Sequence, residues 1–122
     1  MAKRPAKSAG LAGVLSTLNQ QRSAKLRAKL PHWAEAQVHI PSGLSLEQCS
    51  SEATALYKAS LAQALTGGEG SIADLTGGLG VDSWALSRVC ARLLYFERNE
   101  ELCSAAMANF RELGCSNISC FN

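Results

Sequence analysis

The sequence predicts an α/β fold in which a short parallel sheet of β-α-β-α-β order follows a helical N-terminal segment. From position 71 onward, short apolar runs alternate with longer segments whose apolar residues recur at helical spacing. A glycine-rich turn stands between the first apolar run and the helix that follows it. Such alternation with short connections is characteristic of a parallel sheet built from right-handed crossovers.

The second part of the chain holds the expected sheet and its connecting helices. Trp84, Phe96 and Phe110 are expected to contribute to its core, because large aromatic side chains bury the most apolar surface. The expected strands span 71–75, 93–97 and 117–121, and the expected helices span 81–92 and 100–113.

The residues that precede this unit are expected to be mainly helical. Residues 1–9 form a predicted disordered basic tail, since they offer nothing to bury. The segment 10–44 is expected to contain one or two amphipathic helices that end at Pro31, and then an irregular connection. Trp33 and His39 in that connection are interpreted as packing residues.

A further helix is expected directly before the first strand. It begins at Ser45 as N-cap, with Gln48 in the position that completes a capping box, and it ends at the glycines of 67–70. Lys58 is interpreted as a solvated residue of this helix, and Asp82 as a first-turn acid of the next one. The apolar face of the helix is predicted to consist of Ala53, Leu56, Tyr57, Ser60, Leu61 and Ala64.

A net charge of +2 conceals an uneven distribution of charge. Seven basic and no acidic residues precede Glu35, whereas five basic and ten acidic residues stand from Glu35 onward. Such a basic arm can follow phosphate groups of a nucleic acid, and it is equally consistent with a solvated helical face. An organelle transit peptide is a third interpretation, disfavoured because the same helix continues into the domain.

The five cysteines indicate the compartment. Their number is odd and no two of them have C-x-x-C spacing, which favours a reduced, cytoplasmic protein without a metal site. No secretory signal is visible, and no stretch approaches the ~18 apolar residues that a membrane span requires. We therefore expect no contact with a membrane.

The most informative residues lie between the first two expected strands. Asp74 stands near the end of the first strand, and Gly77, Gly78 and Gly80 allow the backbone to turn tightly before the next helix. Glu97 ends the second strand, and a carboxylate there is able to accept both hydroxyls of a ribose. Because the carboxyl ends of parallel strands meet at one edge, these groups are expected to converge on a single nucleoside.

The spacing of the glycines discriminates between nucleoside ligands. The dinucleotide pattern G-x-G-x-x-G fails, because Ser83 or Leu79 stands where a glycine belongs, depending on the starting glycine. The phosphate-binding pattern G-x-x-x-x-G-K-[ST] is absent. An acid followed by alternating glycines, D-x-G-x-G-x-G, fits the segment 74–80 except that Thr76 replaces the first glycine.

The segment Asp-Leu-Thr-Gly-Gly-Leu-Gly-Val-Asp-Ser at 74–83 resembles motif I of bacterial class I S-adenosylmethionine-dependent methyltransferases that act on RNA. It is similar to the Asp-Ala-Thr-Ala-Gly-Leu-Gly-Arg-Asp form of small-subunit ribosomal RNA guanine methyltransferases. The likeness is closer to a Bacteroidetes-type group that carries a THUMP-like domain, through the blocks at 46–55 and 96–100. The resemblance covers about residues 30–122.

This resemblance implies a Rossmann-like class I methyltransferase fold and S-adenosyl-L-methionine as cofactor, with RNA as a possible partner. It implies that Asp74 takes the amino group of the cofactor, Glu97 its ribose hydroxyls, and that Arg98 flanks its adenine. In the competing interpretations, Asp74 caps neighbouring backbone groups and Glu97 is a solvated residue at the end of its strand. The implied cofactor-binding residues are Asp74, Thr76, Gly77, Gly78, Leu79, Gly80, Glu97 and Arg98.

The resemblance also implies a wall for the methionine end of the cofactor. The backbone of Gly78, Leu79 and Gly80 would hold that end, and the substitution at Thr76 leaves the first contact of the turn open. Side chains upstream of motif I would cover it: Gln48, Ser50, Ser51 and Thr54.

Residues that meet the acceptor usually follow the fourth strand in this superfamily, whereas this sequence ends in the expected third strand. Residues 45–122 are therefore expected to form the N-terminal half of the cofactor-binding domain, with the catalytic residues beyond Asn122. We expect weak cofactor binding and no turnover from these residues alone. We also expect the sheet to expose an unpaired edge.

Two other classes of function remain open at this point. The basic arm is compatible with a non-catalytic nucleic-acid-binding module, whose binding would weaken with salt and survive Glu97→Ala. A dinucleotide-dependent oxidoreductase is the third class, and the failed G-x-G-x-x-G pattern argues against it.

Overall fold

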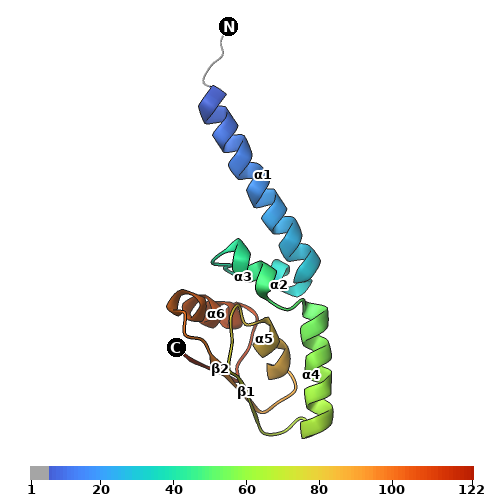
Figure 1. Cartoon of the computed structure of the whole chain (residues 1–122). Helices are drawn as coiled ribbons and strands as arrows, with labels where there is room; N and C mark the ends of the chain where they lie inside the picture. Colours follow the sequence, from blue (N-terminus) through green and yellow to red (C-terminus); the bar gives the residue numbers. More distant parts are fainter. Residues whose placement is uncertain (1–5) are drawn as a thin grey trace.

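A three-stranded parallel sheet in the order β1-β2-β3 forms the centre of the second part of the chain (Figure 1). The structure is a computed structural model and describes residues 6–122. The α/β fold and the β-α-β-α-β order predicted from the sequence are confirmed. The elements of this unit are β1 (Ser71–Asp74), α5 (Val81–Ser87), β2 (Arg92–Phe96), α6 (Glu100–Glu112) and β3 (Ile118–Phe121).

The register of the sheet aligns the carboxyl ends of its strands. Asp74 pairs with Tyr95, and Tyr95 pairs with Cys120, so the residues that follow β1 and β2 emerge at one edge. Leu93 and Tyr95 are fully buried, and the Tyr95 ring packs edge-on against Phe110 of α6 at 5.4 Å. This face of the central strand therefore forms the core between the sheet and its helices.

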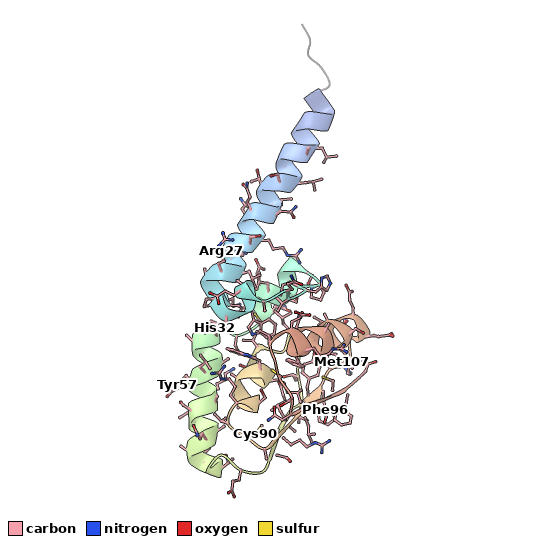
Figure 2. All side chains as sticks on the ribbon, turned by 180° about the vertical axis from the view of Figure 1, so that it is seen from behind. Arg27, His32, Tyr57, Cys90, Phe96 and Met107 are labelled. Carbon is pink, nitrogen blue, oxygen red and sulfur yellow. The ribbon has the colours of Figure 1, made fainter. Side chains whose placement is uncertain are left out.

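Phe96 differs from the expectation that it belongs to this core. Side chains alternate along a strand, so Phe96 points to the face opposite Tyr95. There its ring stacks on that of Phe121 at 4.8 Å, and it is only half-buried (Figure 2). Trp84 and Phe110 are buried as predicted.

Helix α5 is shorter than the segment 81–92 that the sequence predicts. It ends at Ser87, and the side-chain amide of Asn117 donates hydrogen bonds to the carbonyls of Ser87 at 2.8 Å and Cys90 at 3.1 Å. The last carbonyls of a helix need such partners. Here the partner comes from the residue before β3, which local periodicity does not reveal.

One long helix and one short helix replace the amphipathic helices expected to end at Pro31. Helix α1 (Ala6–Lys29) extends away from the rest of the chain, and α2 (Pro31–Glu35) follows after Leu30 (Figure 1). Pro31 begins α2 rather than ending α1, because the first turn of a helix tolerates a residue without an N–H donor.

The first turns of α1 depart from two expectations. The predicted disordered tail over 1–9 overlaps α1, which begins at Ala6, and residues 1–5 lie outside the described part of the chain. The first part of the predicted apolar stripe stays outside the core, since Leu11, Leu15 and Leu18 are each more than half exposed. Only Leu26 and Leu30 reach the core.

Two helices replace the single helix expected from Ser45. Helix α3 (Gly43–Gln48) is capped by Ser42, and α4 (Glu52–Thr66) is capped by Ser51, each serine hydroxyl accepting a backbone N–H at 3.1 Å. Serine favours this position because its oxygen replaces a missing intrahelical partner. Ser45 therefore lies inside α3.

Helix α4 is turned relative to the predicted face. Ala55 and Ala59 are buried against the core, whereas Leu56, Tyr57 and Leu61 of the predicted face are exposed. Tyr57 points away from the rest of the molecule in Figure 2. Helix α4 packs on α5, and its small alanines allow the two helices to approach closely.

A buried carboxylate fastens α4 to α2. The Glu52 side chain, 4% exposed, accepts the backbone N–H groups of His32 at 2.7 Å and Trp33 at 3.0 Å. Its second oxygen lies 2.8 Å from Nδ1 of His32. Glu52 thus satisfies the N-terminal donors of α2 while standing in the first turn of its own helix. Trp33 then packs edge-on against Trp84 of α5 at 6.4 Å, which joins α2 to the core.

Replacing Glu52 by alanine is expected to lower the free energy of unfolding by about 2–5 kcal/mol, because a buried N–H group of Trp33 and a part-buried one of His32 lose their acceptor. Urea denaturation followed by circular dichroism measures this loss. Glu47→Ala is the matched control, since the Glu47 carboxylate pairs with Lys25 in an exposed position and should leave the midpoint nearly unchanged. Equal midpoints for both variants would contradict the role of Glu52.

Candidate functional site

The glycine turn is fastened to the end of the central strand. The backbone N–H of Gly77 donates to the carbonyl of Phe96 at 2.8 Å, and that of Gly80 donates to the carbonyl of Gly77 at 3.0 Å. The first bond continues the pairing of β1 with β2 beyond Asp74. The turn therefore lies over the carboxyl edge of the sheet, where open α/β sheets bind ligands.

Two of the three glycines are required by packing. A Cβ atom at Gly77 would overlap the ring of Tyr95, and one at Gly80, where φ is +99°, would lie 2.6 Å from Cζ of Phe110. Gly78 differs, because a Cβ there would meet only ordinary contacts while φ of +56° disfavours a side chain. The turn thus rests directly on two aromatic rings of the core.

Tyr95 is a structural partner of the turn that the sequence interpretation missed. Its hydroxyl donates to the carbonyl of Gly78. Burial raises the pKa of this phenol well above its ordinary value, and the nearby Glu97 carboxylate raises it further, so the hydroxyl stays a donor. The alternation of β2 was the available signal, because it places Tyr95 on the buried face two residues before Glu97.

Glu97 meets the turn directly. One carboxylate oxygen accepts the N–H of Gly78 at 2.8 Å, and the other accepts the N–H of Asn99 at 2.7 Å. The glycine turn and the carboxylate are therefore in direct contact. Their convergence on a single nucleoside stays a prediction. A carboxylate has about four acceptor sites, so each oxygen of this half-buried group retains capacity for a further donor.

Asp74 ties the two ends of the turn together. One oxygen accepts the hydroxyl of the fully buried Ser83 at 2.7 Å, and the other accepts the N–H of Thr76 at 3.3 Å. This is the backbone-capping role that the sequence left open for Asp74. Contact with a cofactor amino group stays a prediction.

The remaining predicted site residues have different surroundings. Leu79 is buried in the core, so only its backbone is available to a ligand. Thr76 and Arg98 are exposed. The carbonyls of Glu97 and Arg98 both accept the side-chain amide of Asn122, at 2.9 and 3.1 Å.

A pocket of about 400 Å³ lies between the turn and the junction of α3 with α4. Asp74, Glu97 and Arg98 do not line it, so only part of the predicted site borders this pocket. A larger hollow of about 720 Å³ is lined by α1 and α3 and includes no residue of the turn. The small pocket is lined by Ser45, Gln48, Cys49, Ser50, Lys58, Leu102 and residues 76–82.

Only some of the residues that were predicted to cover the methionine end of the cofactor line this pocket. Gln48 and Ser50 line the pocket, and Ser51 and Thr54 do not. Ser51 instead caps α4, and its hydroxyl donates to the Thr54 hydroxyl at 3.0 Å. The last two side chains are thus engaged in the helix cap.

Lys58 and Asp82 meet at the wall of this pocket. The Lys58 ammonium lies 3.1 Å from one Asp82 carboxylate oxygen and 3.1 Å from the Ser50 hydroxyl. Asp82 stands in the first turn of α5, as predicted, but it is also the partner of Lys58. Its second oxygen is buried and has no hydrogen-bond partner among the described residues.

The thiol of Cys49 also borders the pocket. Burial raises its pKa above the ordinary value, and its Sγ donates to the carbonyl of Leu46 at 3.1 Å. Nucleophilic and metal-binding cysteines act as thiolates, which this environment disfavours. Over residues 6–122, no three His, Cys, Asp or Glu side chains gather in a group that could hold a metal ion, and no helix is long and apolar enough to cross a membrane.

Three cations of the basic arm are engaged within the molecule. Arg22 donates to the carbonyl of Ile40 at 3.0 Å, and Lys25 pairs with Glu47 at 2.7 Å. Lys29 donates to the carbonyls at 46 and 47, both at 2.8 Å. These three cations fasten α1 to the segment around α3, so phosphate groups would have to compete for them.

Gly77→Ala is expected to lower the free energy of unfolding by about 1–3 kcal/mol, because the new methyl group overlaps the buried Tyr95 ring. Gly43→Ala is the matched control, since open space surrounds that position and its φ is not left-handed. Urea denaturation compares the two variants. A stable Gly77→Ala protein would contradict the tight seating of the turn.

Comparison with known proteins gives one informative similarity. Neither a protein-family model nor a curated protein gives a significant match. The crystal structure of a proposed methyltransferase from Porphyromonas gingivalis W83 matches 81% of this chain, with a TM-score of 0.71 and 37% sequence identity. The chain spans about a quarter (24%) of that protein's length. The similarity supports a methyltransferase fold for this chain.

Proposed function

We propose that this chain binds S-adenosyl-L-methionine and takes part in the transfer of its methyl group to RNA. The observation that carries the proposal is the contact between the Glu97 carboxylate and the N–H of Gly78 at the carboxyl edge of the sheet. It brings an acceptor for ribose hydroxyls next to a turn whose backbone can approach a ligand closely. The similarity to a proposed methyltransferase supports the same class of reaction.

Glu97 is suited to the ribose because its geometry is already fixed. Backbone N–H groups of Gly78 and Asn99 hold the two carboxylate oxygens in place, so little side-chain freedom is lost when a ligand binds. The two hydroxyls of a ribose can each donate to one of these oxygens. Charge-assisted hydrogen bonds of this kind are stronger than neutral ones.

The role of the turn is to position the donor. A bound S-adenosylmethionine supplies an electrophilic methyl group, and transfer by in-line displacement requires donor and acceptor at ~3 Å in alignment. Asp74 and Tyr95 fix the turn from two sides, so the residues of the turn contribute to alignment by being rigid. RNA as the acceptor class is supported by the likeness of residues 74–83 to motif I of RNA-modifying enzymes.

Glu97→Ala is expected to weaken binding of S-adenosylmethionine by about ten- to a hundredfold, since two hydrogen bonds to a charged group are lost. Isothermal titration calorimetry measures the affinity, and circular dichroism checks that the variant is folded. Glu101→Ala is the matched control, because Glu101 is exposed in the first turn of α6 and should leave the affinity unchanged.

Two results would contradict the proposal. Equal affinities for Glu97→Ala and the unsubstituted chain would remove Glu97 from the cofactor site. Absence of cofactor binding, together with salt-dependent RNA binding that survives Glu97→Ala, would instead indicate a non-catalytic nucleic-acid-binding module.

A further inference from the structure

We propose that Lys58 binds the carboxylate at the amino-acid end of the methyl donor and makes the pocket selective for a zwitterionic ligand. This assignment rests on the proposed function and adds a specificity residue to the same site. Among residues 6–122, Lys58 is the one cationic side chain that lines the pocket of about 400 Å³ beside the glycine turn.

The position of Lys58 follows from the orientation of α4. Ala55 and Ala59 form the buried row of that helix, so Lys58 lies at the border of this row instead of on the far face. Its ammonium reaches across to Asp82 in the first turn of α5 and to Ser50 before α4. Three separate segments thus hold one cation at the pocket wall.

The hydrogen bonds around Lys58 leave one donor for a ligand. An ammonium group has three N–H donors, and two of them are directed to Asp82 and Ser50, each at 3.1 Å. The third is available to an anionic group in the pocket. A carboxylate bound there would also lie close to the backbone of the turn, which lines the same pocket.

Asp82 indicates which kind of anion is favoured. Its carboxylate beside Lys58 would repel a doubly charged phosphate group, but it suits a ligand that carries a cation next to its anion. The second Asp82 oxygen is buried without a hydrogen-bond partner in the described part of the chain, and buried polar atoms are normally paired. The ammonium of an α-amino acid group would supply such a donor close to its carboxylate. This assignment places the amino group of the cofactor at Asp82 and not at Asp74, which does not line the pocket.

The competing explanation is an ion pair that serves stability alone. The Lys58 side chain is 49% exposed and that of Asp82 is 32% exposed, and ion pairs in such positions contribute little to folding. If the pair serves stability alone, replacing Lys58 or Asp82 should affect ligand binding in the same way. If Lys58 binds the ligand carboxylate, only the replacement of Lys58 should remove the preference for the carboxylated ligand, and this difference can be measured.

The test compares S-adenosylmethionine with decarboxylated S-adenosylmethionine, which lacks only the carboxylate, by isothermal titration calorimetry on the 122-residue chain. Lys58→Met is expected to weaken binding of the complete ligand by about ten- to a hundredfold, and binding of the decarboxylated ligand by less than about threefold. Lys58→Arg should retain most of the preference for S-adenosylmethionine over the decarboxylated ligand, because it keeps the positive charge. Arg27→Met removes the same charge from α1 and is the matched control.

Asp82→Asn separates the two explanations. It removes the ion pair and keeps the cation, so the preference for the carboxylated ligand should persist. The assignment is overturned if Lys58→Met loses affinity equally for both ligands. It is also overturned if that variant keeps the same preference for S-adenosylmethionine over the decarboxylated ligand. If the unsubstituted chain binds neither ligand, the proposed function falls together with this assignment. Binding of S-adenosylmethionine with no dependence on Lys58 overturns the assignment alone.

Discussion

The hydrogen bond from Gly78 to the Glu97 carboxylate holds the organisation of the site together. It joins the loop after β1 to the loop after β2, and the Tyr95 hydroxyl secures the same glycine from beneath. Gly77 and Gly80 pack so closely on the rings of Tyr95 and Phe110 that neither position has room for a side chain. This close packing fixes the position of the turn on the core. The backbone of the turn is therefore packed directly against the core below it.

The helices before the sheet complete the site from the other side. Glu52 ties the start of α4 to α2, and the break between α3 and α4 leaves Ser50 and Cys49 at the rim of the pocket. The same orientation of α4 turns Lys58 toward Asp82. The buried Glu52 carboxylate thus helps to fix the helix that carries Lys58. Under the proposed assignment of Lys58, ligand selectivity would depend on the packing of α4 against α5 that also stabilises the fold.

The sequence predicted the sheet well because strand signals are local. The expected runs at 71–75 and 117–121 are each one residue longer than the observed strands, and the run at 93–97 is shifted by one residue from the observed strand at 92–96. The predicted orientation of α4 was wrong because Leu56 and Tyr57 carry larger apolar surfaces than Ala55, yet the buried row is set by a close helix contact and by the hydrogen bonds of Glu52. The early end of α5 depends on Asn117, thirty residues beyond Ser87. Such long-range partners leave no periodic trace in a single sequence.

Amide resonances offer the most direct test of whether the turn and Glu97 hold one nucleoside. In a ¹⁵N–¹H spectrum recorded during titration with S-adenosylmethionine, we expect the amides of Gly78 and Asn99 to shift together and to saturate at the same ligand concentration. Both donate to the Glu97 carboxylate that would accept the ribose hydroxyls. Amides of the exposed part of α1, such as that of Leu15, should not move. Shifts confined to α1 and α3, with Gly78 and Asn99 unchanged, would show that the turn and Glu97 do not hold the ligand.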